Sequence, residues 1–335
     1  MTTRMPAATG HIHALPAYPA EAFRVETGAN MGDSLGVLDD LVLDDTYLLH
    51  PDAEPARLAL EARPDGSFAI APASALGSPG AALHLDCAVS LMGPGGRMAE
   101  ALVLVETDSR GMIEEVYLLP LAPLQARKPY TLVRASRDDA RKTLAQAASS
   151  SFIRGTRITL ATGAQVKIED LKPGDRVLTR DGGAQAIRWV GQATLRAEGS
   201  LAPVLIRAGA LNNEHDLLVG PNHRLFVYQR ADEIGAGAAE LLVTARDLVN
   251  GATVTVQDGG FADYFQILFG SHHLIYAEGI AAESLLVDPL TEPALPGALR
   301  LTTAHGRRGS HGVEVSRSLL DRPDAVDALK RASLR

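Results

Sequence analysis

Short apolar runs separated by turn residues fill most of the chain from residue 23 onward. The stretch at residues 41–72, LVLDDTYLLHPDAEPARLALEARPDGSFAIAP, predicts three strands. A turn at Pro64-Asp65-Gly66 joins the last two, because proline fixes φ and glycine supplies a positive φ. Two more strands are expected on either side of residues 108–111. Such short connections favour antiparallel neighbours, so we expect a mostly β N-terminal domain.

One segment of the first half has helical rather than strand periodicity. Residues 137–148, RDDARKTLAQAA, place alanine and leucine at helical spacing and predict a connecting helix. The serine triplet at residues 149–151 ends it.

The second half returns to short strands with frequent turns. Turn signals occur at residues 162–163, 173–175 and 181–183. Strands are predicted at residues 204–206, 217–219, 225–228, 241–243, 253–256, 264–269 and 274–277. With no helices between them, these strands predict a second all-β domain. The final residues, VSRSLLDRPDAVDALKRASLR, predict a short C-terminal helix.

These patterns divide the chain into four parts. We expect a loose N-terminal segment at residues 1–22 and a β-rich domain with its connecting helix at residues 23–148. The second β-domain spans residues 149–290, and residues 291–335 form a C-terminal tail. The predicted fold class is therefore all-β, with two domains, one connecting helix and a short terminal helix.

Composition narrows the choice of partners. Hydrophobic residues are 46% of the 335 and charged residues 21%, which is typical of an ordered globular protein. A net charge of −8 and 4% aromatic residues argue against a nucleic-acid partner. A single cysteine, Cys87, excludes an internal disulfide and any cysteine metal cluster, and its apolar neighbours predict a buried thiol. No phosphate-binding glycine loop of either standard spacing is visible.

The chain also lacks the marks of membrane attachment. No run approaches the roughly 18 apolar residues of a membrane span. The N-terminus has no continuous apolar core of a signal peptide. We therefore expect no membrane partner, and a protein that is cytoplasmic or exported without a cleaved leader.

Three sequence blocks then occur in order after the serine triplet. Ser151 precedes FIRGTRITLATGAQVKIEDLKPGDRVLTRDG, and His223 lies in LLVGPNHRLFV. The third block, DYFQILFGSHHLIYAEGIAAESLL, contains Gln266 and His272. Together these blocks resemble the Hint (hedgehog/intein) domain family, in particular bacterial Hint-domain proteins of the alphaproteobacterial type. The resemblance covers about residues 149–290, and residues 23–148 look like the β-rich domain that precedes the module in some of these proteins.

The resemblance implies a β-horseshoe fold and self-cleavage without a cofactor. Ser151 falls on the nucleophile position and would attack the preceding carbonyl in an N→O acyl shift at the Ser150–Ser151 bond. His223 falls on the histidine that protonates the leaving amide, and His272 or Gln266 would assist ester breakdown. The substrate is the protein's own N-terminal domain, which cleavage would release. Water or an unknown nucleophile is the acceptor, and each molecule turns over once.

This sequence departs from the family pattern at several of these positions. Serine replaces the usual cysteine, Gly220 stands where threonine or serine is common, and Gln266 stands where relatives often carry histidine. No His-Asn pair is present, so complete splicing is not expected. A shift of one or two residues would make Ser150 or Ser149 the nucleophile. We expect backbone N–H groups near Gly155 to bind the oxyanion.

Two other functions stay open. The departures are compatible with a Hint domain that has lost catalysis and serves as a structural or binding scaffold. A hydrolase acting on other molecules has less support, because no Ser/His/acid set with suitable flanking residues is visible in the sequence.

Overall fold

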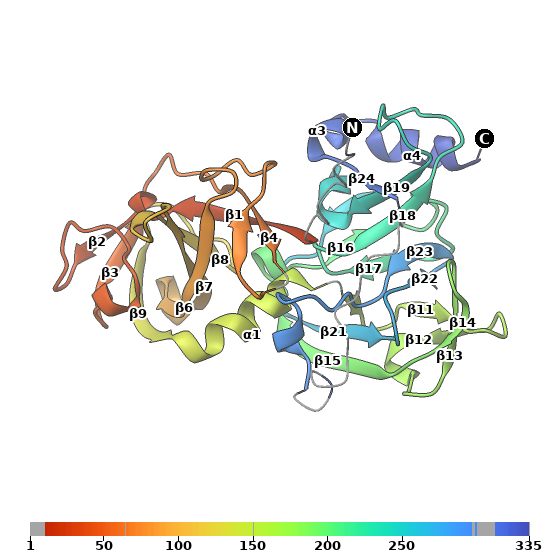
Figure 1. The fold of residues 1–335 in the computed structure, drawn as a ribbon, viewed down its shortest axis with the longest axis horizontal. Helices are drawn as coiled ribbons and strands as arrows, with labels where there is room; N and C mark the ends of the chain where they lie inside the picture. Colours follow the sequence, from red (N-terminus) through yellow and green to blue (C-terminus); the bar gives the residue numbers. More distant parts are fainter. Residues whose placement is uncertain (1–10, 64, 150, 297–298, 300–311, 335) are drawn as a thin grey trace, which may run out of the picture. The chain divides into compact units, whose positions relative to one another are not determined.

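Antiparallel strands dominate the computed structural model, which describes residues 11–63, 65–149, 151–296, 299 and 312–334 (Figure 1). Contacts divide the chain into two units. The first comprises residues 1–148 and 288–296, and the second comprises residues 149–287 and 297–335. The predicted all-β fold is confirmed. Among the described residues, no helix is long and apolar enough to cross a membrane.

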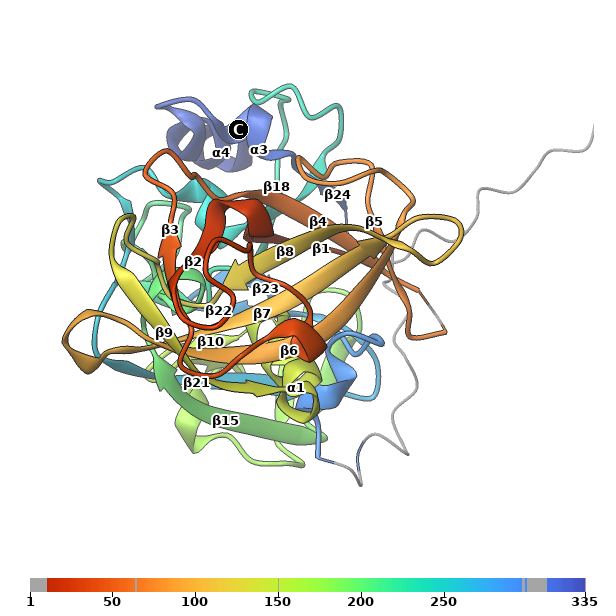
Figure 2. The ribbon, with the colours of Figure 1, turned by 90° about the vertical axis from the view of Figure 1, so that its left-hand side faces the viewer.

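The first unit is built on one nine-stranded sheet (Figure 2). Its strands are β1 (His11–Pro19), β2 (Phe23–Thr27), β3 (Thr46–Leu49), β4 (Ala56–Ala62), β5 (Phe68–Ile70), β6 (Ala82–Met92), β7 (Met98–Thr107), β8 (Ile113–Pro120) and β9 (Pro129–Ser136). The order is β2-β3-β9-β6-β5-β4-β1-β8-β7, and β6 also pairs with β7. This extra pairing closes β6, β5, β4, β1, β8 and β7 into a barrel. Short 3-10 turns lie at η1 (Ala20–Ala22), η2 (Leu38–Asp40) and η3 (Pro94–Gly96).

Alternating side chains fill the core of this unit. Cys87, Val89 and Leu91 of β6 are all fully buried, at the spacing of two that a strand requires. The prediction of a buried thiol is thus confirmed, and burial raises the pKa of Cys87 to about 12. The connecting helix α1 (Arg137–Ala148) lies where the sequence predicts it and contacts β6.

The expectation of a loose segment at residues 1–22 is wrong for residues 11–22. Strand β1 pairs with β4 from His11 to Ala17 and with β8 at Tyr18 and Pro19. Its buried positions alternate as His13, Leu15 and Ala17, and without β1 the barrel would be open. Residues 1–10 of that expected segment lie outside the described residues.

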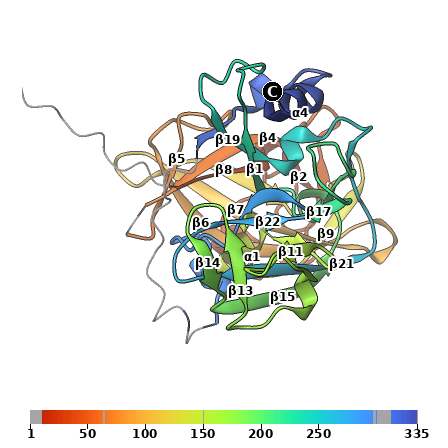
Figure 3. The same cartoon turned by 90° about the vertical axis from the view of Figure 1, so that its right-hand side faces the viewer.

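The second unit contains two sheets (Figure 3). Its strands are β10 (Phe152–Ile153), β11 (Arg157–Thr159), β12 (Gln165–Lys167), β13 (Arg176–Thr179), β14 (Gly183–Ala186), β15 (Trp189–Arg196), β16 (Val204–Ile206), β17 (Leu217–Val219), β18 (Arg224–Tyr228), β19 (Glu240–Thr244), β20 (Val254–Val256), β21 (Phe261–Leu268), β22 (Leu274–Ala277), β23 (Ile280–Glu283) and β24 (Val313–Glu314). Three 3-10 turns are η4 (Ile168–Asp170), η5 (Gly199–Leu201) and η6 (Ala245–Leu248). One sheet runs β15-β21-β10-β17-β16-β20. The other runs β12-β11-β22-β23-β18-β19-β24, with β13 and β14 joined through β22.

Within the expected tail at residues 291–335, the described residues 312–334 are not separate from the second unit. Helices α3 (Arg317–Leu320) and α4 (Ala325–Leu334) confirm the expected helical end, but their apolar side chains belong to the core of the second unit. Val315, Leu320, Val326 and Leu329 are each at most 5% exposed. Strand β24 adds a parallel edge to β19. Burial of these side chains explains why the segment packs instead of extending into solvent.

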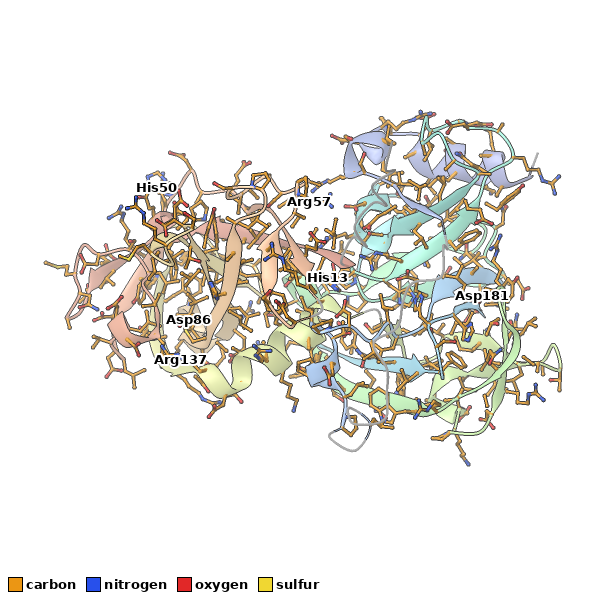
Figure 4. The ribbon with its side chains drawn as sticks, in the orientation of Figure 1. His13, His50, Arg57, Asp86, Arg137 and Asp181 are labelled. Atoms are coloured by element: carbon orange, nitrogen blue, oxygen red, sulfur yellow. The ribbon has the colours of Figure 1, made fainter. Side chains whose placement is uncertain are left out.

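Residues 288–296, here called the return segment, belong to the first unit. Asp288 accepts hydrogen bonds from the backbone N–H groups of Leu290 and Thr291, and its Oδ2 lies 2.9 Å from Nε2 of His13 (Figure 4). The 3-10 turn η7 (Glu292–Ala294) packs on α1. Leu290 is 1% exposed. The chain thus comes back to complete the first unit after the second unit has begun.

Candidate functional site

Ser151 lies at the start of β10, which is an inner strand of the six-stranded sheet. Phe152 pairs with Val219 of β17 on one side and with Phe265 of β21 on the other. The carbonyl oxygen of Ser151 accepts a hydrogen bond of 2.8 Å from the Gly220 N–H. The residue is 7% exposed, so its hydroxyl is held in a largely enclosed position.

A tight turn brings His223 to Ser151. The His223 N–H donates to the Gly220 carbonyl at 3.0 Å, and Pro221 occupies the second position of this turn, where its fixed φ is favoured. The ring then lies 4.3 Å from the ring of Phe152, centroid to centroid. Its Nδ1 is 2.9 Å from the carbonyl oxygen of Ser151. Two residues that the sequence singled out are therefore in direct contact.

The environment of His223 fixes its protonation state. The residue is fully buried, and this loss of solvation lowers its pKa from 6.5 to about 4, despite the hydrogen bond with Ser151 and the charge of Glu283. The ring is therefore neutral near pH 7. Because a carbonyl oxygen can only accept, Nδ1 carries the proton and donates it to Ser151. Within the described part of the chain, Nε2 is buried without a hydrogen-bond partner.

This burial predicts a loss of stability at low pH. A histidine whose pKa is lower in the folded state binds its proton more readily in the unfolded state. The free energy of unfolding therefore starts to decrease as the pH falls below 6.5, and this decrease is complete below about pH 4. The difference corresponds to roughly 3 kcal/mol of unfolding free energy. Urea unfolding at pH 7 and pH 4 should show a smaller pH dependence for His223→Gln than for the wild type. Equal pH dependence in the two proteins would contradict the burial argument.

Gly220 leaves room for the Ser151 hydroxyl. A Cβ atom at position 220 would lie 2.5 Å from Ser151 Oγ and 3.5 Å from its carbonyl oxygen. The atom that a Cβ at position 220 would meet is the Ser151 side-chain oxygen. The backbone at position 220 can therefore stay in place if the Ser151 hydroxyl rotates away. The threonine or serine expected at this position in relatives would displace the hydroxyl as the structure holds it.

This contact gives a double-mutant prediction. We expect Gly220→Ala to destabilise the wild type by about 1–2 kcal/mol, as overpacking does, but to cost clearly less in a Ser151→Ala background. Urea unfolding of the four proteins measures the coupling. Additive effects would show that the hydroxyl does not point at Gly220.

A buried charge network extends from His223 toward His272. Glu283, 1% exposed, has Oε1 at 3.9 Å from His272 Nε2 and Oε2 at 3.5 Å from Arg224 Nη1. The charge of Glu283 also acts on His223. The structure thus connects the two predicted histidines through Glu283. Sequence reasoning assigned no role to Glu283 or Arg224, although both lie within the quoted blocks.

The other predicted site residues are Gln266 and the two earlier serines of the triplet. Phe265 of β21 pairs with Phe152 of β10. Because the two strands are antiparallel, the next residue of β21, Gln266, lies opposite Ser151. Its side chain is half-buried and, among the described residues, makes no hydrogen bond to Ser151. Ser149 is 4% exposed, and Ser150 lies outside the described residues. The expected Ser150–Ser151 bond is therefore described only on its Ser151 side.

The expected oxyanion role of backbone near Gly155 is not supported. The Gly155 N–H already donates to Oε2 of Glu169 at 2.8 Å. The neighbouring N–H groups of Arg154 and Thr156 bond to the carbonyls of Asp263 and Ile153. These hydrogen bonds stabilise the turn after β10. They would have to break before the same N–H groups could bind the oxyanion of a reacting carbonyl.

Comparison with known proteins gives one family match and several similar solved structures. Residues 150–289 match the model of the Hint domain family. Solved structures similar to this chain include the Ssp DnaB mini-intein variant M86, at 10% identity and TM-score 0.28, covering 42% of this chain and 97% of that one. The gp41-1 intein (12%, TM-score 0.25) and the MchDnaB-1 intein (13%, TM-score 0.26) each cover 40% of this chain and, respectively, 97% and 98% of their own. No curated protein matches the chain.

Apart from its last two residues, the matched segment lies in the second unit. The family match confirms, over residues 150–289, the resemblance to Hint domains that the three sequence blocks indicate.

Proposed function

We propose that the Hint domain cleaves its own chain at the Ser150–Ser151 bond. The observation that supports this most is the hydrogen bond between His223 Nδ1 and the carbonyl of Ser151, at 2.9 Å. It places an imidazole N–H on the residue whose nitrogen would be the leaving group. The Ser151 hydroxyl belongs to the residue on the C-terminal side of that bond.

The reaction proceeds in two balanced steps. The Ser151 oxygen attacks the carbonyl carbon of residue 150, the C–N bond breaks, and the hydroxyl proton is passed on so that the nitrogen leaves as the free amine of Ser151. Water then attacks the resulting ester, giving a carboxylate on residue 150 and restoring the hydroxyl. Because an ester is less stable than an amide, protonation of the released amine is needed to draw the first step forward.

Each histidine has a distinct part in this proposal. His223 is the acid that donates to the departing nitrogen, with the Nδ1 proton it carries when neutral. His272, held against Glu283, assists the attack of water on the ester. Gln266 would orient that water from the adjacent strand.

The test is the intact mass of freshly purified protein followed over several days. Wild type should change from one species of 35.4 kDa to fragments of residues 1–150 and 151–335, and His223→Ala should remain whole. Hydroxylamine should accelerate cleavage by intercepting the ester. A cleavage rate that hydroxylamine leaves unchanged would contradict an ester intermediate.

A second candidate is a Hint domain that binds rather than cleaves. One observation favours it: the Gly155 N–H, which was expected to bind the oxyanion, is already bonded to Glu169. One stable mass in both wild type and His223→Ala would support this alternative. Fragments in the wild type alone would exclude it.

A further inference from the structure

Three polar side chains outside the Ser151 site form a hydrogen-bonded chain. Ser271 Oγ lies 2.9 Å from His273 Nε2, and His273 Nδ1 lies 2.9 Å from Asp181 Oδ2. Asp181 extends from the turn between β13 and β14, where Figure 4 labels it, while Ser271 and His273 lie between β21 and β22. Serine, histidine and carboxylate are thus joined in the order that a serine hydrolase uses.

The carboxylate fixes which imidazole nitrogen carries the proton. Hydrogen bonds from His273 and from the Leu274 N–H, 3.1 Å from Asp181 Oδ1, outweigh the effect of burial and hold the pKa of Asp181 below its ordinary value. An ionised carboxylate accepts only, so His273 donates from Nδ1. In the neutral imidazole, Nε2 is then the lone-pair nitrogen that faces the Ser271 hydroxyl and can take its proton.

The backbone of His273 is held by two hydrogen bonds, and Ser271 is open to solvent. The backbone N–H of His273 bonds to Ser284 Oγ at 3.0 Å, and its carbonyl accepts the Ser284 N–H at 2.9 Å. His273 is 8% exposed, whereas Ser271 is exposed. A Cβ atom at Gly270 would meet nothing within 4 Å, so the approach to Ser271 is clear on that side.

Backbone donors are available beside the hydroxyl. In the part of the chain that is described, the N–H groups of Gly270 and Ser271 make no hydrogen bond. Free N–H groups next to a nucleophile are the usual means of stabilising an oxyanion. A reacting carbonyl at Ser271 could accept from them without displacing an existing acceptor.

This group is separate from the autoprocessing site. His272 faces Glu283, which is linked to His223, while its neighbour His273 faces Asp181. Adjacent histidines thus serve two different clusters. The Ser/His/acid set went unseen in the sequence because Asp181 is 92 positions from His273.

We propose that Ser271, His273 and Asp181 form a hydrolytic site for small carboxylic esters. Ser271 attacks the ester carbonyl, His273 Nε2 takes the hydroxyl proton, and the alcohol leaves with that proton, giving an acyl-serine. Water then attacks the acyl-serine and gives one proton to His273, which passes it to Ser271 Oγ as the carboxylic acid leaves and the serine hydroxyl is restored. Ser271 is exposed, so a short ester can reach its hydroxyl from solvent.

The experiment uses the full chain carrying Ser151→Ala, so that the other nucleophile is absent. A fluorophosphonate probe should modify Ser271, read by peptide mass spectrometry, and p-nitrophenyl acetate should be hydrolysed. Ser271→Ala should abolish the modification. Asp181→Asn should reduce both the labelling rate and hydrolysis by at least 100-fold, because the wrong tautomer of His273 is then favoured.

A matched control is Ser318→Ala, which removes an exposed serine whose hydroxyl lies 2.8 Å from the Ser316 hydroxyl. It should change neither the labelling of Ser271 nor the hydrolysis of p-nitrophenyl acetate. Thermal unfolding should be alike for all variants that are compared. Two results would overturn the proposal. One is a wild-type Ser271 that reacts no faster than Ser318. The other is labelling of Ser271 that Asp181→Asn leaves unchanged, because the serine would then be reactive without the acid.

Discussion

Ser151→Cys is expected to cleave at least tenfold faster than the wild-type chain, at the same bond. A thiol near neutral pH is a few per cent ionised and is a strong nucleophile, whereas a serine hydroxyl has a negligible ionised fraction. The position is 7% exposed, and burial would raise the pKa of the new thiol, which limits the gain. Intact mass spectrometry over time gives the rate, and hydroxylamine should increase it further.

The serine triplet supplies the control for this experiment. Ser149 is also buried, at 4% exposed, and lies two residues earlier. Ser149→Cys should leave the rate and the cleaved bond unchanged. Faster cleavage before residue 149 would instead assign the nucleophile to that position, and a Ser151→Cys protein that folds but never cleaves would favour the binding alternative.

The two products of cleavage are expected to stay bound to each other. The return segment is part of the fragment that begins at Ser151, yet it packs in the first unit with the other fragment. Leu290 is 1% exposed there, and Asp288 pairs with His13. Release of the N-terminal domain, as the family resemblance implies, would require these groups to be exposed to water.

Leu290→Ala should weaken this association by roughly 30-fold or more, because truncation of a buried leucine costs about 2–5 kcal/mol. Native mass spectrometry and size exclusion at decreasing concentrations measure it. Leu43→Ala, at a leucine of the same unit that is 56% exposed, should have no effect. Products that separate at micromolar concentration in the wild type would contradict the expectation.

Local sequence signals predicted much of the architecture. The helix at residues 137–148 was predicted with its observed bounds, because alanine and leucine at helical spacing form a buried face. The turn at residues 173–175 was also identified correctly, since Asp175 accepts the Lys172 N–H. The Hint blocks pointed to Ser151 and His223, which the structure brings into contact. Their chemical roles stay predictions.

What the sequence did not reveal depends on distant partners. Strand β1 was missed because two of its three alternating buried positions, His13 and Ala17, do not look strongly apolar. The return segment reads as an irregular proline-containing loop, and its hydrogen-bond partner His13 is 275 positions away. Asp181 was recognised as a turn residue, but nothing near it in the sequence indicates that its carboxylate holds His273.

The return segment also bears on how such a protein could be rearranged in evolution. The Hint domain looks in the sequence like an interchangeable module between residues 149 and 290. Recombination at those boundaries would remove Asp288 and Leu290, which complete the neighbouring unit. A foreign Hint domain could be accommodated only if it brought equivalent residues. The barrel and its Hint domain should therefore be inherited as a pair.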